Sequence, residues 1–143
     1  MSDVLHVGYI GLGNIGKPSA RHLVRDGFRA HVYDVVPAAV EELVAAGASG
    51  HDEIATLAGA CRHIGICVRD NAQVEAVLYG DGGIFANADR GTLVAIHSTV
   101  TREALLRWSN DAAAHGITVI DAAISGGAQG AEAGALCYMV GGA

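Results

Sequence analysis

Three glycines near the start of the chain have the spacing of a loop that binds phosphate groups. They belong to the segment Gly11-Leu12-Gly13-Asn14-Ile15-Gly16, which follows an apolar run and opens a stretch with helical spacing. Gly11 permits a tight turn, Gly13 lets the backbone approach a pyrophosphate, and Gly16 lets the helix pack closely on the strand. The backbone amides and the dipole at the helix start favour negative charge there. The segment therefore predicts a site for the pyrophosphate of a dinucleotide.

An acidic residue follows this loop at the distance expected of a nucleotide site. Asp34 ends the second expected strand, near the ~20-residue spacing at which a carboxylate hydrogen-bonds the adenosine ribose. A carboxylate there repels a 2′-phosphate, and Val35, Val36 and Pro37 follow where an arginine would accept one. The sequence therefore predicts NAD as the cofactor and makes NADP less favourable.

The cysteines do not have the spacing of a metal site. Cys61, Cys67 and Cys137 include no paired C-x-x-C motif, although His63 lies between the first two. We expect Cys67 to pack as a small hydrophobic residue, because it lies in an apolar run. An odd number of cysteines without a secretory signal indicates free thiols in a reducing compartment. We therefore predict no metal.

Composition excludes two classes of partner. The net charge of −6 disfavours a nucleic-acid binder, which needs clustered Lys and Arg. No run approaches the ~20 apolar residues that span a bilayer. Residues 1–3 lack the basic character of a signal peptide. We expect a cytoplasmic protein with no nucleic-acid or membrane partner.

Apolar strand-like runs alternate with helix-like stretches along the chain. This alternation predicts an α/β fold, a Rossmann-like doubly wound and mostly parallel sheet with helices on both faces. We expect residues 1–143 to form one dinucleotide-binding domain. The expected strands cover 4–10, 30–33, 63–68, 92–96, 117–120 and 135–140, and the expected helices cover 15–26, 37–46, 52–59, 72–78 and 101–115.

Four segments, taken in order, resemble the β-hydroxyacid dehydrogenases. That family includes 3-hydroxyisobutyrate dehydrogenase and tartronate semialdehyde reductase, and it is related to 6-phosphogluconate dehydrogenase. The segments cover 8–18, 66–70, 97–100 and 121–131, so the resemblance extends over essentially the whole chain. It implies hydride transfer between NAD and a small β-hydroxy acid.

The resemblance also implies roles for the cofactor-binding positions. Val68 and Arg69 would lie along the adenosine and ribose, and Thr99 would lie near the nicotinamide. Arg69 stands where the family usually has proline, and its side chain either reaches a cofactor phosphate or faces solvent. The pyrophosphate would be held by Gly11, Leu12, Gly13, Asn14 and Ile15.

A second glycine-rich segment matches the part of the family that binds substrate. Ser125, Gly126 and Gly127 would bind the substrate's carboxylate, since a hydroxyl and successive glycine amides can form an anion-binding nest. From the residues alone, the segment is equally a flexible turn before the last strand. Ala123 stands where the family usually has proline, and we expect His97, at a strand end, to be structural.

The sequence holds one lysine, and its position limits the chemistry. The family's general acid/base is a lysine on the helix after the nucleotide domain, and the resemblance places that position beyond Ala143. Lys17 instead lies in the first turn of the pyrophosphate helix, remote from the expected nicotinamide. We therefore expect no catalytic residue in this chain, which would be an N-terminal NAD-binding domain without its helical C-terminal domain and inactive alone.

Other interpretations remain open. Without a second domain, the last strand would expose apolar surface through which the chain self-associates. One alternative function is a standalone dinucleotide-sensing module without catalysis. Another is an imine reductase-like protein, although those relatives generally prefer NADP and lack the Ser-Gly-Gly segment.

Overall fold

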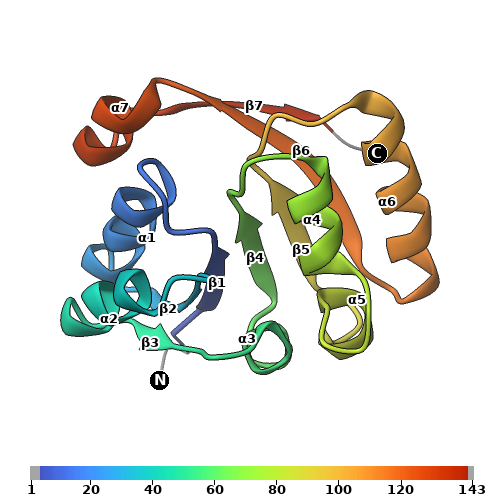
Figure 1. Ribbon diagram of the computed structural model, residues 1–143, viewed down its shortest axis with the longest axis horizontal. Helices are drawn as coiled ribbons and strands as arrows, with labels where there is room; N and C mark the ends of the chain where they lie inside the picture. Colours follow the sequence, from blue (N-terminus) through green and yellow to red (C-terminus); the bar gives the residue numbers. More distant parts are fainter. Residues whose placement is uncertain (1–3, 142–143) are drawn as a thin grey trace.

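Within residues 4–141, seven strands form a single sheet with helices on both faces (Figure 1). The strands are β1 (His6–Ile10), β2 (Arg29–Tyr33), β3 (Ser49–Gly50), β4 (His63–Ile66), β5 (Leu93–Ile96), β6 (Thr118–Ser125) and β7 (Cys137–Gly141). The helices are α1 (Gly16–Arg25), α2 (Pro37–Ala45), α3 (Ile54–Ala60), α4 (Asn71–Leu78), α5 (Ile84–Asn87), α6 (Arg102–Ala114) and α7 (Gly127–Ala133).

The computed structural model describes residues 4–141. Two expectations from the sequence therefore concern residues outside the described part. One is the absence of a signal peptide, which was judged on residues 1–3. The other is the family's lysine, which the resemblance places beyond Ala143 and which stays a prediction.

The strand order confirms the predicted fold class. It runs β3-β2-β1-β4-β5-β6-β7, with β1 to β6 parallel and β7 antiparallel to β6. The first six strands therefore have the order 3-2-1-4-5-6 of a Rossmann-like sheet. Since β1 to β6 are parallel, all six carboxyl ends meet at one edge of the sheet.

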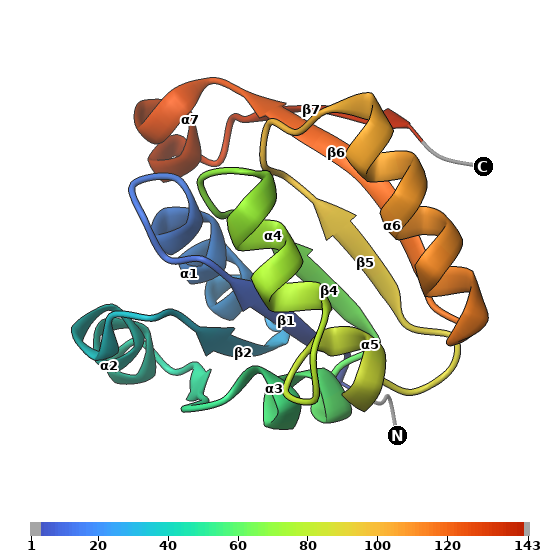
Figure 2. The ribbon, with the colours of Figure 1, turned by 45° about the vertical axis from the view of Figure 1, so that its right-hand side comes forward.

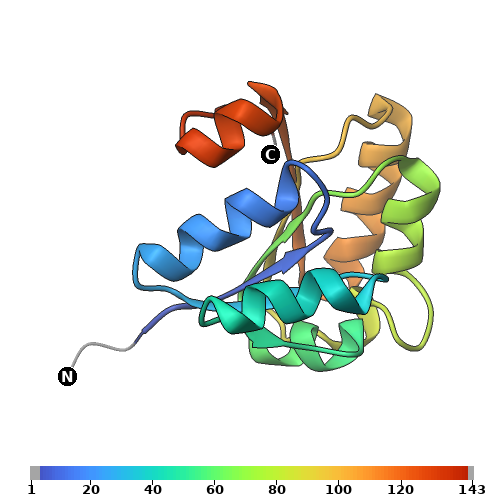
Figure 3. The ribbon, with the colours of Figure 1, turned by 60° about the vertical axis from the view of Figure 1, so that its left-hand side comes forward.

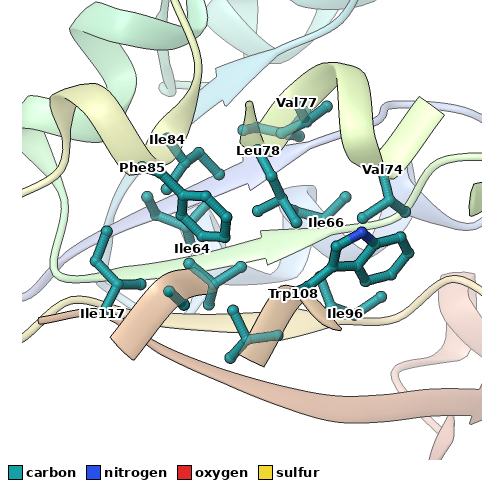
Figure 4. Packing of buried hydrophobic residues seen from close by; sticks show 14 of the residues in the cluster. Ile64, Ile66, Val74, Val77, Leu78, Ile84, Phe85, Ile96, Trp108 and Ile117 are labelled. Carbon is teal, nitrogen blue, oxygen red and sulfur yellow. The ribbon is translucent and has the colours of Figure 1, made fainter. Parts of the chain in front are cut away.

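Both faces of the sheet are covered by helices, because the strands are apolar on both sides. One face packs against α3, α4, α5 and α6 in a core centred on β4 and β5. Figure 4 shows Trp108 of α6 in this core, beside Val74 and Ile96. The indole is fully buried, and its Nε1–H donates to the Glu75 carboxylate at 3.2 Å. The burial of this large ring joins α6 to α4.

The opposite face packs against α1 and α2. Ala20 of α1 and Leu43 of α2 are completely buried there against Val32 of β2. Figure 3 shows α1 and α7 together on the side of the sheet away from α4 and α6. His22 of α1 contacts the carbonyl oxygen of Glu132 in α7 at 2.9 Å, which fixes the two helices to each other.

Every strand and helix expected from the sequence is present, with ends that differ by at most two residues except in β6, which continues to Ser125, five residues beyond its expected end. Residues 4–141 contain three additional short elements. The strand β3 is two residues long, too short to give a periodic pattern. The helix α5 has four residues and directly follows the glycines at 80–83. The helix α7 is composed of glycine, alanine, glutamine and glutamate, so its sequence has no apolar stripe.

Three histidines form a hydrogen-bonded chain across the first three strands. His31 of β2 contacts His6 of β1 at 2.9 Å and His51, just after β3, at 2.8 Å, and His51 Nδ1 contacts the Thr56 hydroxyl at 2.9 Å. The Thr56 hydroxyl donates its own proton to the Glu53 carbonyl oxygen, so it must accept from His51. Each ring then donates from Nδ1 and accepts at Nε2 in the contacts between neighbours. The chain therefore needs neutral rings at His31 and His51.

Burial keeps those two rings neutral. The pKa of His31 is lowered to about 4, first by burial and then by the nearby His51, His6 and Arg29. Burial also lowers the pKa of His51, although the Asp52 carboxylate opposes that shift.

None of the helices in the described range 4–141 is both long enough and apolar enough to cross a membrane.

Candidate functional site

A cleft of about 810 Å³ opens at the carboxyl ends of β1, β2 and β4. In the sheet β1 lies between β2 and β4, so the connections from β1 and β4 leave toward opposite faces (Figure 2). Such a switch in strand order leaves a crevice beyond the carboxyl ends of the strands, where doubly wound sheets bind ligands. The volume lies within the range of small-molecule sites. The cleft is therefore the candidate site of the fold.

The predicted glycine loop forms the floor of this cleft. Gly11 has φ of +100°, and a Cβ there would lie 2.1 Å from the carbonyl oxygen of Cys67 on the neighbouring chain segment. A Cβ at Gly16 would lie 1.8 Å from the Gly11 carbonyl oxygen. A Cβ at Gly13, in contrast, would meet nothing within 4 Å. Two glycines are thus required by close packing, and the middle one borders open space.

Asp34 lies in the same cleft and also holds the glycine loop. Its Oδ1 accepts from the Leu12 amide at 3.0 Å, and its Oδ2 accepts from the Val36 amide at 3.0 Å. Each carboxylate oxygen has a second lone pair, so the group can still accept from a ligand. The carboxylate predicted to contact ribose therefore also joins the end of β2 to the loop after β1.

The end of β4 is fixed by hydrogen bonds to its neighbours. The Val68 amide donates to the Ser98 hydroxyl at 2.9 Å, and Ser98 is buried at the end of β5. The Arg69 amide donates to the Gln73 side chain at 2.8 Å, while Asp70 caps α4 by accepting from the Gln73 amide at 2.9 Å. Both predicted residues, Val68 and Arg69, line the cleft.

The remaining predicted residues lie at the same sheet edge, outside the cleft. Thr99 is exposed just after β5. Ser125 ends β6, and Gly126 and Gly127 have φ of +129° and +61° at the start of α7. The segment thus bends sharply from strand to helix.

His97 has a structural environment. Its Nδ1 donates to the Ala122 carbonyl oxygen at 2.9 Å, and its ring stacks on Tyr9 and meets the edge of Tyr138. Burial lowers the pKa of His97, which keeps the ring neutral. Residues 4–141 include no cluster of His, Cys, Asp or Glu able to hold a metal ion.

The three cysteines are free thiols. Cys67 packs against the α1 and α2 core, and burial raises the pKa of its thiol. It therefore lines the cleft as a neutral apolar group.

Sequence reasoning missed the apolar wall of the cleft. Ile54 of α3 and Ala76 and Val77 of α4 line it together with Val36 and Ala39. No local pattern marks these residues, since they come together only when α2, α3 and α4 are placed around the same edge. Ser98 was within reach of sequence reasoning, because it precedes Thr99 in a segment already singled out.

The chain's own residues fit a dinucleotide. The apolar wall of the cleft suits a base, and a carboxylate with free lone pairs suits a ribose. The open space beside Gly13 lies in the loop that leads into α1, and the backbone amides at a helix start favour the charge of a pyrophosphate.

Comparison with known proteins agrees with this geometry. A family model described as the NAD binding domain of 6-phosphogluconate dehydrogenase matches residues 6–143. The 2-(hydroxymethyl)glutarate dehydrogenase of Eubacterium barkeri is 36% identical over 141 residues, which are 99% of this chain and 47% of that protein. The 3-hydroxyisobutyrate dehydrogenase of Pseudomonas aeruginosa is 36% identical over 136 residues, 95% of this chain and 46% of that protein. The chain thus spans about half the length of these curated relatives.

Solved structures share the fold closely. The 3-hydroxyisobutyrate dehydrogenase of Mycobacterium tuberculosis with L-serine matches with a TM-score of 0.91 at 26% identity, over 99% of this chain and 47% of that chain. The structure of Psf3 in complex with NADP+ and 2-OPP also gives 0.91, at 30% identity, over 96% of this chain and 49% of that chain.

Proposed function

Since the chain belongs to the family of the NAD binding domain of 6-phosphogluconate dehydrogenase, we propose that it is the cofactor-binding part of a dehydrogenase for small β-hydroxy acids. The cleft at the strand-order switch is the observation that carries this proposal, because it joins the glycine loop and Asp34 in one site. The named activities of the relatives, which include 3-hydroxyisobutyrate dehydrogenase, support the substrate class.

The proposed cofactor site uses the residues around the cleft. Gly13, Asn14 and Ile15 hold the pyrophosphate with Gly11 and Leu12, and Asp34 accepts from the adenosine ribose. The backbone at Val68 and Arg69 lies along the adenosine and ribose, and Thr99 lies beside the nicotinamide. When bound, NAD supplies the hydride acceptor for oxidation of the alcohol.

The proposed substrate site lies farther along the same edge. The turn at Ser125, Gly126 and Gly127 offers a hydroxyl and backbone amides to a carboxylate. We place the complete reaction in a whole protein of which residues 1–143 form the dinucleotide-binding domain. A helical domain beyond Ala143 would supply the lysine and complete the site. The free thiols favour a cytoplasmic location.

Titration calorimetry with NADH and NADPH tests the cofactor assignment. We expect the chain to bind NADH more tightly, because the Asp34 carboxylate repels a 2′-phosphate. Asp34→Ala should reduce the difference between the affinities for NADH and NADPH. A wild-type preference for NADPH would contradict the role of Asp34, and failure to bind either nucleotide would contradict the proposed function.

A turnover assay tests the proposal that the chain alone is inactive. Lys17 is the sequence's only lysine, and its Nζ is paired with the Glu42 carboxylate at 3.2 Å, so it is not placed to exchange a proton with substrate. We expect the chain to bind NAD but to produce no NADH from 3-hydroxyisobutyrate or glycerate. Turnover at a rate on the order of 1 s⁻¹ or more, typical of enzymes, would contradict this.

A further inference from the structure

Arg69 is a cation at the rim of the cleft that the fold itself does not use. It is exposed after β4, and within residues 4–141 its guanidinium forms neither a hydrogen bond nor an ion pair. The other cation lining the cleft, Lys17, is bound by the Glu42 carboxylate, which also contacts Arg21. Within the described residues, no protein carboxylate therefore competes with a ligand for the Arg69 guanidinium.

The backbone that carries this side chain is fixed, although the guanidinium itself is free. The Arg69 backbone amide donates to the side-chain oxygen of Gln73, and the Gln73 backbone amide donates to the Asp70 carboxylate at the first turn of α4. The Asp70 carboxylate is thus directed to the helix start. Arg69 extends from a fixed backbone beside Val68, which is itself held by Ser98.

The charge balance of the cleft gives this cation a role. The chain carries a net charge of −6, and the cleft contains the Asp34 carboxylate. A pyrophosphate brings two further negative charges, which the partial positive charge at the start of α1 offsets only in part. An arginine with several unused donors suits phosphate oxygens.

We propose that the Arg69 guanidinium, at the cleft that the glycine loop also lines, pairs with the pyrophosphate of the bound dinucleotide. This inference rests on the proposed function and gives the Arg69 side chain a direct contact with the cofactor. It assigns Arg69 to the phosphate, and not to stacking on the adenine ring or to solvent.

A ligand series separates these roles. Wild-type, Arg69→Gln and Arg69→Lys chains are titrated with NADH by fluorescence, and ADP-ribose and adenosine are measured by competition. Arg69→Gln should weaken NADH and ADP-ribose about tenfold, the loss expected of one charge-assisted pair, and leave adenosine unchanged. Arg69→Lys should recover part of the loss. The difference between wild type and Arg69→Gln should shrink at high salt.

Arg25→Gln provides the matched control. Arg25 is an exposed arginine at the end of α1, away from the cleft, so its loss changes the net charge equally. It should leave NADH binding unchanged, and thermal melting should show that all variants fold.

Three outcomes would contradict the inference. Equal NADH binding by wild type and Arg69→Gln overturns this inference and leaves the proposed function standing. A loss of adenosine affinity as large as that of NADH does the same, because it indicates stacking on the base. A wild-type chain that binds no nucleotide overturns the proposed function as well.

Discussion

One added methyl group should have different consequences at two glycines of the same loop, a loss of stability at Gly16 and weaker NADH binding at Gly13. Gly16→Ala places a Cβ 1.8 Å from the Gly11 carbonyl oxygen, so the backbone must move. We expect a loss of about 2 kcal/mol, within the range for overpacking, and a fall in Tm of roughly 5 °C. Gly13→Ala meets nothing within 4 Å and should keep the wild-type Tm while weakening NADH binding about tenfold. Melting and fluorescence titration of both variants check this, and a stable Gly16→Ala chain would contradict the close approach.

Asp34 contributes to stability as well as to ligand binding. Its carboxylate accepts from the Leu12 and Val36 amides, so Asp34→Ala leaves both donors without this partner. We expect a loss of about 1–3 kcal/mol in the free energy of unfolding, measured by urea denaturation without nucleotide. An unchanged midpoint would indicate that water replaces the carboxylate at both amides.

The histidine chain joins three strands and should make stability depend on pH. The pKa of His31 is about 4 in the folded chain and about 6.5 when unfolded, so the unfolded state binds more protons between these values. Stability therefore rises with pH across this window and is lost as pH falls from 6.5 to 4. His31 should therefore lower the free energy of unfolding by about 3 kcal/mol as the pH falls through this window.

Two variants isolate that effect. His31→Val suits a buried strand position and should flatten the pH dependence between 4 and 6.5 in urea denaturation. His63→Gln, at an exposed histidine outside the chain of three, should retain it. An equal pH dependence in wild type and His31→Val would exclude His31 as its source.

At the scale of the whole molecule, one edge of the sheet is formed by β7, a strand with exposed apolar side chains. Tyr138, Met139 and Val140 are 45%, 54% and 65% exposed, and β6 pairs with one side of the strand only. Such an edge favours pairing with a second copy. We expect self-association that increases with concentration in light scattering under reducing conditions, and we expect Val140→Lys to reduce it. A monomer at high concentration would contradict this.

The order of strands and helices was readable from the sequence because it depends on local periodicity. Apolar runs such as 63–68 alternate with helical stretches, and glycines mark their ends. The elements that were missed, β3, α5 and α7, are short or lack an apolar stripe. These elements form because of contacts with other parts of the chain, such as the contact of His22 in α1 with α7.

The glycine loop and Asp34 could be predicted from the residues alone, since their spacing follows from the geometry of one βαβ unit. The surroundings of these residues depend on the folded chain. The hydrogen bond between Val68 and Ser98 joins residues that are distant in sequence. Ile54 likewise lines the cleft beside residues from other parts of the chain. These contacts could not be predicted because no local pattern encodes strand order, and strand order sets which carboxyl ends lie side by side. That order places Arg69, which has no partner among the residues that the structure describes, at the rim of the cleft whose floor is the glycine loop.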